Sequence, residues 1–349
     1  MLYSKLLKNN KISNTSNKNY TYFKIIFIVG AIFLFIISSL FLYIGSERIS
    51  FIEIYDSIFH FNASNFSHII IKDIRLPRLL ADIIVGGSLA IAGAIMQCNT
   101  KNPMADTGIM GVNAGATFAI IFMMTFFPNL SRLERFGFSF LGALIATILI
   151  YSIAVMGRRG STPERMILSG MAVSTLFSSI TMAIILKNGA VIRMMKYMAG
   201  SSANTRWMDI KISIPFFLIC VFLSLIIAKT LTLSNLGDEV SKGLGVNLFI
   251  GKLLSTLIVL FLSGISVIVI GPVGYVGLLI PYIVKLIVGL DYRYILPISC
   301  MYGAIFVTVV DLIARTIIRP REFPVGIIVA VVGVPFFIAV STAKRKNNY

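Results

Sequence analysis

Charged residues, cysteine, histidine and tryptophan are all scarce in this sequence. Only 13% of its 349 residues are charged, and it has three cysteines, two histidines and one tryptophan. So little charge beside 57% hydrophobic residues excludes a soluble globular domain. Cys98, Cys220 and Cys300 lack the spacing of metal ligands or of a disulfide framework. We therefore interpret them as small buried apolar residues.

The motifs of enzymes are absent as well. There is no HExxH and no nucleophile elbow, and the only histidines, His60 and His68, lie together in one segment. The stretch GVNLFIGK (245–252) is a poor phosphate-binding loop, because five residues separate its glycines and leucine follows its lysine. We expect no catalytic site, no metal and no cofactor in this chain.

Long apolar runs recur along the whole sequence, and its mean hydropathy is +0.90. A membrane-spanning helix needs about 20 apolar residues, and runs of that length exclude a β-barrel. The sequence predicts an all-α polytopic membrane protein with about ten transmembrane helices. The eighth is short, and we expect Gly271 to Gly277 before it to form a bent turn inside the protein. The predicted spans are 24–44, 77–97, 107–128, 137–157, 165–187, 210–232, 248–271, 275–290, 294–316 and 325–343.

The net charge of +17 comes from residues in short loops at the ends of these spans. Lipid head groups and membrane topology explain that distribution better than nucleic acid does. A lysine-rich start, the loop GRRGSTPER and a KRK tail favour cytoplasmic termini in a cell-membrane protein. We divide the chain into a polar tail (1–23), one membrane domain (24–343) with an outer segment (45–74), and a basic tail (344–349). The first span is near full length, so we expect it to remain uncleaved.

One stretch between the sixth and seventh spans, LSNLGDEVSKGLGVNLF (233–249), is too polar to cross a membrane. Its apolar residues recur at helical spacing, and its charged residues fall on other faces. Asn235 and Asp238 have the spacing of a capping box, and Gly243 and Gly245 are suitable stops. The pattern predicts one short cytoplasmic helix within 234–247. Its apolar positions are Leu233, Leu236, Val240 and Leu244.

Ionisable residues inside spans are functional candidates, because each costs about 2.5–3.5 kcal/mol on insertion scales. Asp82, Lys285, Asp311 and Arg315 qualify. Asp311 and Arg315 are four residues apart, so a local ion pair competes with a functional role. Asp82 lies one turn after Arg78, which favours mutual neutralisation over a proton relay.

Three stretches of the sequence, taken together in this order, resemble a known family of membrane proteins. RLPRLLADIIVGGSLAIAGAIMQCNTKNPMADTGIMGVNAGA (75–116) begins with paired arginines, breaks at Asn102-Pro103 and restarts at Gly111-x-x-x-Gly115. LGDEVSKGLGV follows, and then GPVGYVGLLIPYIVKLIVGLDYRYILP with DLIAR and FPVGIIVAVVGVPFF. Together they resemble the FecCD-type permeases of ABC importers for iron-siderophore, haem and cobalamin. The small residues Gly86, Gly87, Ala90, Gly93 and Ala94 of the first stretch permit close helix packing.

The resemblance implies a fold like that of the cobalamin importer permease, of the type II ABC importer class. It implies a second permease subunit, a cytoplasmic ATPase dimer that binds ATP and magnesium, and a substrate-binding protein outside the membrane. The short helix becomes the coupling element, with Gly237, Asp238, Glu239, Leu244 and Gly245 as matched positions. A helix that merely rests on the membrane surface is the alternative.

The resemblance also assigns roles at the two faces. Arg75, Arg78 and Arg315 become docking points for acidic residues of the binding protein, since an exposed guanidinium pairs with carboxylates; head-group anchoring is the alternative. Inner gates are implied at Asn102, Met104, Ser161 and Thr162, although polar loop tips are also ordinary. The sequence departs from the family pattern at Asp82, Tyr282, Lys285 and Tyr292.

We expect an importer permease for an iron complex, foremost a ferric siderophore, with haem and cobalamin as alternative cargoes. Two other classes stay open. A proton-coupled carrier using Asp82 or Asp311 would transport without an ATPase, and a membrane scaffold would transport nothing.

Overall fold

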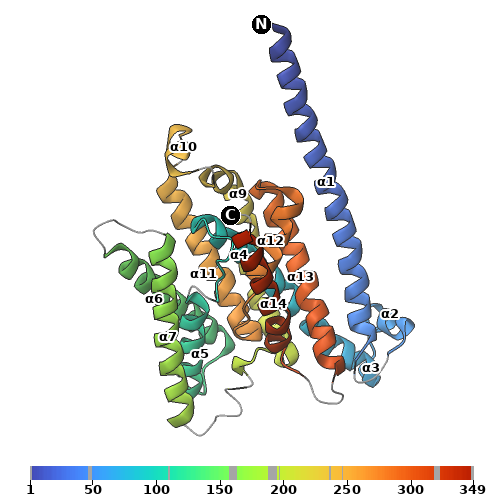
Figure 1. The fold of residues 1–349 in the computed structure, drawn as a ribbon. Helices are drawn as coiled ribbons and strands as arrows, with labels where there is room; N and C mark the ends of the chain where they lie inside the picture. The colour runs from blue at the N-terminus through green and yellow to red at the C-terminus, as the bar shows by residue number, and fades with distance from the viewer. Residues whose placement is uncertain are drawn as a thin grey trace.

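The computed structural model describes residues 2–45, 49–108, 111–156, 163–187, 195, 197–235, 237–245, 247–317 and 323–346. Every regular element among them is helical, and the long helices run roughly side by side (Figure 1). A π-helical turn, Ile70–Arg75, leads directly into α4. The others are α1 (Leu2–Tyr43), α2 (Phe51–Phe59), α3 (Phe66–Ile69), α4 (Leu76–Asn99), α5 (Val112–Phe126), α6 (Arg132–Val155), α7 (Pro163–Lys187), a 3-10 turn (Ser202–Asn204), α9 (Trp207–Ser234), α10 (Asp238–Gly243), α11 (Leu248–Ile270), α12 (Val276–Val288), α13 (Tyr292–Ile317) and α14 (Val325–Lys346).

The predicted spans each coincide with one of these helices. Among the described residues, seven helices are long and apolar enough to cross a membrane, and α5, α12 and α14 contain shorter apolar segments. The stretch before α12 is a partly buried, non-helical turn in which Gly271 and Tyr275 both have positive φ. The prediction of about ten helices, with a short eighth span after an internal turn, is confirmed.

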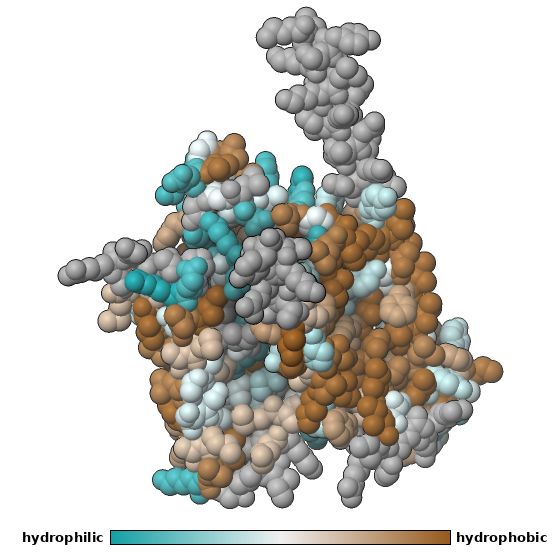
Figure 2. Space-filling view, viewed as in Figure 1, coloured by the Kyte–Doolittle hydropathy of each residue, from teal (hydrophilic) through white to brown (hydrophobic). Residues whose placement is uncertain are grey.

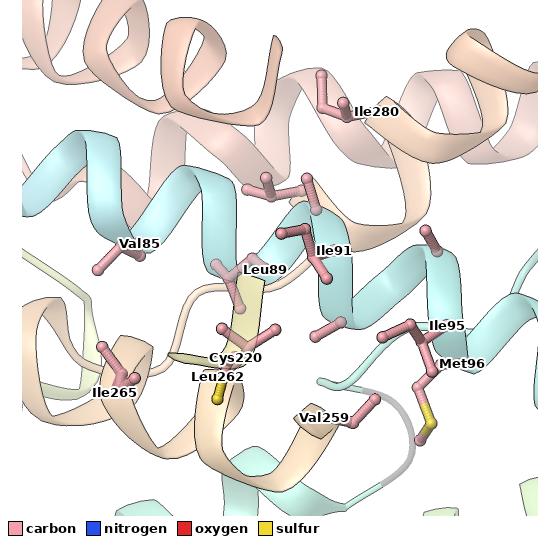
Figure 3. Packing of buried hydrophobic residues seen from close by; sticks show 14 of the residues in the cluster. Val85, Leu89, Ile91, Ile95, Met96, Cys220, Val259, Leu262, Ile265 and Ile280 are labelled. Carbon is pink, nitrogen blue, oxygen red and sulfur yellow. The ribbon is translucent and has the colours of Figure 1, made fainter. Parts of the chain in front are cut away.

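Helix α4 forms the centre of the domain, and nearly all of its residues are buried. It packs against α9, α11, α12 and α13. Small residues explain this central place, as the sequence predicted: a Cβ on Gly86 would overlap the Gly303 carbonyl of α13, and one on Gly93 would overlap the backbone of Gly277. Figure 3 shows the apolar packing around α4, with Val85, Leu89, Ile91, Ile95 and Met96 near Cys220, Val259, Leu262, Ile265 and Ile280.

The close approach of α4 and α13 yields the first prediction. Gly86→Val should lower the melting temperature of the purified protein substantially, because the added carbons meet backbone that cannot move aside, and overpacking costs about 1–3 kcal/mol or more. Gly137→Val is the matched control, since no atom outside the neighbouring backbone of its own helix lies within 4 Å of a Cβ placed at Gly137. Equal melting temperatures for the two variants would contradict the observed packing.

The outer surface of the bundle is apolar, as a lipid-facing surface requires. Helix α1 exposes a long apolar row, and α6, α7 and α9 expose similar rows. Figure 2 shows this apolar surface extending over the α1 side of the molecule. The exposed α1 row includes Ile25, Ile28, Ile32, Phe35 and Ile36.

The two ends of the bundle differ. Helix α10 projects beyond the ends of α9 and α11, and the first residues of α1 and the end of α14 point the same way (Figure 1). Helices α2 and α3 lie at the opposite end. We call these the α10 end and the α2 end.

Candidate functional site

The short polar helix between α9 and α11 is present, but it is shorter than predicted. It covers Asp238–Gly243 and begins after Gly237, whose φ of 119° and ψ of 150° favour glycine strongly. The capping-box prediction is wrong, because Asn235 ends α9 and the N-cap of α10 is Gly237, which has no capping side chain. Gly245, with φ of 77°, follows the helix as the predicted stop.

Helix α10 is held to α9 by one buried hydroxyl that the sequence reasoning missed. Ser241 Oγ lies 2.8 Å from the Leu233 carbonyl oxygen and 2.6 Å from that of Gly237, and the side chain is fully buried. Val240 and Leu244 point outward and are 52% and 59% exposed. Glu239 is also exposed. A fixed helix therefore presents two apolar side chains at the tip of the α10 end.

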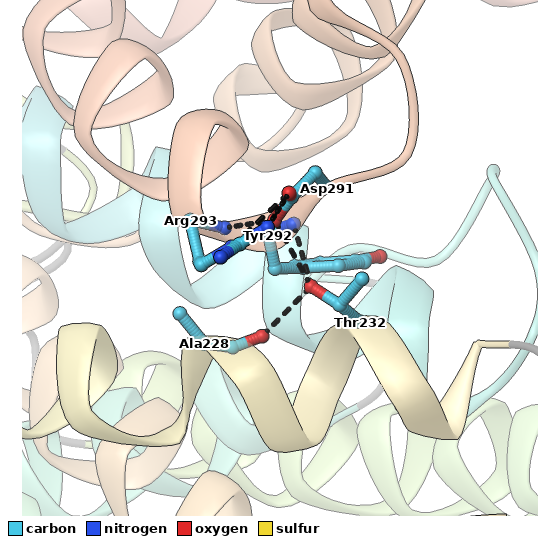
Figure 4. A network of polar contacts seen from close by, with 5 residues as sticks. All are labelled: Ala228, Thr232, Asp291, Tyr292 and Arg293. Carbon is cyan, nitrogen blue, oxygen red and sulfur yellow. Dashed lines mark hydrogen bonds and ion pairs between the residues drawn. The ribbon is translucent and has the colours of Figure 1, made fainter. Parts of the chain in front are cut away.

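A polar network joins the last turn of α9 to the start of α13 (Figure 4). The Tyr292 backbone N–H donates to Thr232 Oγ1 at 2.9 Å, and Asp291 accepts four hydrogen bonds from Arg293. Partial burial opposes ionisation of Asp291, but the hydrogen bonds and charge of Arg293 prevail and lower its pKa. The carboxylate thus stays charged and keeps the start of α13 fixed beside the end of α9.

The three predicted docking arginines gather at the α2 end, but they are not exposed. Arg75 and Arg78 are each 4% exposed, and Arg315 is 8% exposed. Arg78 forms a bidentate ion pair with Asp311 of α13, with nitrogen–oxygen distances of 2.7 and 2.8 Å. The expectation of exposed guanidinium groups is therefore wrong within this chain, and the docking role itself stays a prediction.

The other two arginines bind the C-terminal end of α1. Arg75 donates to the carbonyl oxygens of Leu42 and Tyr43, and Arg315 donates to that of Phe41. The Arg315 guanidinium also stacks 3.8 Å from the centre of the Phe41 ring. Cations at a helix C-terminus satisfy its free carbonyls and its dipole. These arginines therefore fix α1 against α4 and α13.

The two acidic residues of this cluster differ in their partners. Asp311 pairs with Arg78, so the local Asp311–Arg315 pair is not the one the structure makes. Asp82 is fully buried beside Asp311, Arg78 and Ser202. Within the described part of the chain, neither of its carboxylate oxygens has a hydrogen-bond partner. Arg78 therefore pairs directly with Asp311, and Asp82 lies buried beside that pair.

Lys285, the remaining ionisable residue within a span, links α4 to α12. Its Nζ donates to Gln97 Oε1 at 2.8 Å, and Gln97 Nε2 donates in turn to the carbonyls of Gly277 and Leu278. The lysine thus has a packing role.

The loop after α4, which carries two of the predicted gate residues, docks onto the turn before α12. Asn102 Oδ1 accepts a hydrogen bond from the Met104 backbone N–H at 2.9 Å, and both side chains are half-buried. Asp106 holds the loop in place, because its Oδ2 accepts from the Tyr275 backbone N–H at 3.1 Å. Ser161 and Thr162 lie outside the described residues.

A cavity of about 740 Å³ lies near the α2 end, between the starts of α6 and α9 and the end of α11. It contains the ion pair of Arg132 and Asp209 beside Arg135. Neither Asn102 nor Met104 lines it. Across the described residues, no three metal-ligating side chains lie together.

Comparison with known proteins decides the family. The sequence model of the FecCD transport family matches residues 30–343, which is most of the chain. The chain belongs to the FecCD transport family. Members of this family are transport components, so the chain is a subunit of a transporter and not an enzyme.

Individual relatives agree along nearly the full length. The Fe(3+)-citrate import system permease protein YfmD of Bacillus subtilis is 39% identical over 92% of this chain and 95% of the relative. The iron(3+)-hydroxamate import system permease protein FhuB of the same organism is 36% identical, over 93% and 84%. The cobalamin import system permease protein BtuC of Halobacterium salinarum is 35% identical, over 81% and 76%.

A solved structure supports the same fold. An inward-facing structure of a metal-chelate type ABC transporter superposes with a TM-score of 0.79, at 25% identity, over 91% of this chain and 99% of the other. FecCD membership and these similarities make the chain a multi-pass membrane permease subunit of an ABC importer.

Proposed function

We propose that this chain forms the membrane pathway for a ferric chelate, with ferric citrate and ferric hydroxamate siderophores as the first candidates. Two relatives that are 39% and 36% identical over more than nine-tenths of this chain are permeases for these iron complexes. Cobalamin remains a second cargo class because a cobalamin permease also matches over most of its length. Haem has no such support among the named relatives.

The structural observation that supports an ATP-driven importer is the pair of exposed apolar side chains at the α10 end. A six-residue helix fixed by Ser241 presents Val240 and Leu244 to the exterior of the bundle. Exposed apolar side chains on a rigid projection are suited to a groove on a protein partner. We assign this partner as a cytoplasmic ATPase dimer, whose nucleotide-driven movement reaches α9 and α11 through α10.

The remaining parts of the assembly follow from that assignment. The α10 end faces the cytoplasm, which places both chain termini on the cytoplasmic side of the cell membrane. A substrate-binding protein delivers cargo to the α2 end, and a second permease subunit completes the pathway. The Asn102–Met104 loop acts as an inner gate, with Ser161 and Thr162 as its predicted companions. ATP and magnesium bind to the ATPase.

The proposal is tested by uptake of radioactive iron into proteoliposomes that contain the permease, its co-purifying ATPase and its binding protein. Ferric citrate and a ferric hydroxamate are supplied separately, with ATP, without ATP, and with a proton gradient alone. We expect uptake only with ATP and the binding protein. Uptake by the chain alone that depends on a proton gradient and is lost in Asp82→Asn would contradict the proposal and favour a secondary carrier. ATP-dependent uptake of cobalamin alone would change the cargo and keep the mechanism.

A further inference from the structure

Helix α2 at the α2 end has three distinct sides. With about 100° per residue, Ile54 and Ser57 fall on one side, and both are buried. Glu53 and Asp56 fall on a second side. The third side carries large apolar residues, and all of them are exposed: Phe51, Ile52, Tyr55, Ile58 and Phe59.

The exposed side is too apolar for an aqueous surface. Ile52 is 75% exposed and Phe59 is 67% exposed, and Tyr55 packs its ring 4.7 Å from that of Phe59. Phe66 of the neighbouring α3 is 69% exposed. Such a group of exposed apolar side chains marks an interaction surface.

The buried side of α2 fixes its position relative to the membrane helices. Ile54 belongs to a small apolar core with Phe41 and Leu42 of α1 and Leu79 of α4. Phe51 stacks on Tyr43, the last residue of α1, with ring centres 4.8 Å apart. Helix α2 therefore lies beside the end of α1, at one end of the bundle. Its capping box, formed by Ser50 and Glu53, keeps the helix formed at this position.

We propose that α2 lies in the phospholipid interface at the α2 end and anchors this end of the bundle in the bilayer. This exposed apolar patch adjoins the end of α1, where Phe51 stacks on Tyr43, and α1 crosses the membrane. Aromatic residues concentrate at this depth in membrane proteins, and an amphipathic helix buries its apolar side at the boundary of head groups and acyl chains. Glu53 and Asp56 then face water. Their negative charge predicts no preference for anionic lipids.

The anchor has a consequence for the arginine cluster. Ile54 shares its core with the α1 residues whose carbonyls bind Arg75 and Arg315. Insertion of α2 would therefore set the depth of the whole cluster in the membrane. A docking surface for the binding protein is the competing use of the same patch, and the experiment distinguishes the two.

Fluorescence quenching tests the proposal directly. Trp207 is the only native tryptophan, so Trp207→Phe provides a silent background in which Tyr55→Trp or Phe59→Trp reports from the patch. Each protein is reconstituted into phosphatidylcholine vesicles whose acyl chains are brominated close to the head group. We expect brominated lipid to quench both reporters several-fold more than aqueous iodide does.

Glu53→Trp is the matched control on the water-facing side. This change removes the Glu53 half of the capping box, but the other half is retained, because Ser50 Oγ still accepts from the backbone N–H of residue 53. We expect the opposite result there, with strong quenching by iodide and weak quenching by lipid. Strong iodide quenching of the two patch reporters would overturn the proposal. If added binding protein then shielded them from iodide, the patch would be a protein-docking surface. Neither arm uses ATP or cargo, so the result is independent of the transported substrate.

Discussion

Arg78→Ala should destabilise the protein by about 3–5 kcal/mol, the cost of removing one partner from a buried ion pair. Arg78 supplies both hydrogen bonds to the Asp311 carboxylate, at 2.7 and 2.8 Å. Without it, Asp311 and Asp82 remain as two neighbouring acids, both fully buried. We expect a large loss of melting temperature in detergent and poor recovery of folded protein from membranes.

A paired replacement separates charge burial from loss of packing. Arg78→Met combined with Asp311→Leu removes both charges and keeps side-chain volume, so it should recover most of the stability lost in Arg78→Ala. Arg135→Ala is the control, because Arg135 is a half-buried arginine at the same end that hydrogen-bonds the nearby Pro128 carbonyl. If Arg78→Ala left the melting temperature unchanged and weakened only binding-protein affinity, Arg78 would be a docking residue after all.

The contrast between the predicted and observed roles of the arginines shows where sequence reasoning stops. RLPR at the start of a span correctly indicates a boundary, and an arginine at a boundary is normally exposed. The partner of Arg78 lies 233 residues away, and the carbonyls bound by Arg315 and Arg75 belong to the end of α1. No local sequence pattern predicts such contacts, since they depend on which helices pack together.

The membrane helices were predictable because their signal is local. Each span needs a run of apolar residues, and small residues spaced along α4 indicate that other helices approach it closely. At the glycine pairs Gly86–Gly303 and Gly93–Gly277, the backbone of α4 comes close to that of α13 and α12, as those small residues indicate. Membership of a known family added the order of the helices, which composition alone does not specify.

The contact between the Asn102–Met104 loop and the turn before α12 was predictable only in part. Asp106 holds the Asn102–Met104 loop to Tyr275, and 169 residues separate the acid from its partner. Both segments are rich in glycine and proline, so irregular backbone was predictable in each. Their contact was not, although an acidic residue in an otherwise apolar stretch was a usable hint of a buried partner.

Leu244→Asp should abolish ATP-driven uptake while the permease still inserts and binds lipid normally. Leu244 is 59% exposed and touches little of its own chain, so the change costs the isolated subunit almost nothing. In a complex, the carboxylate would enter an apolar groove. Loss of a central interface residue costs 2 kcal/mol or more, which corresponds to roughly a 30-fold weaker ATPase affinity or greater. Val240→Asp should behave alike, because Val240 lies one turn earlier on the same exposed side.

Two further variants decide whether α10 transmits movement or only binds the ATPase. Lys242→Gln changes an exposed polar residue of α10 and should leave uptake intact. Ser241→Ala removes the hydroxyl that fixes α10 to the Leu233 carbonyl, while Val240 and Leu244 stay unchanged. If rigid contact carries the motion, Ser241→Ala should retain ATPase binding and ATP hydrolysis but lose much of the uptake. Uptake unaffected by both Leu244→Asp and Val240→Asp would exclude α10 as the contact with the ATPase. Uptake lost together with binding in Ser241→Ala would mean that the hydroxyl maintains the fold of α10 and has no separate role in transmission.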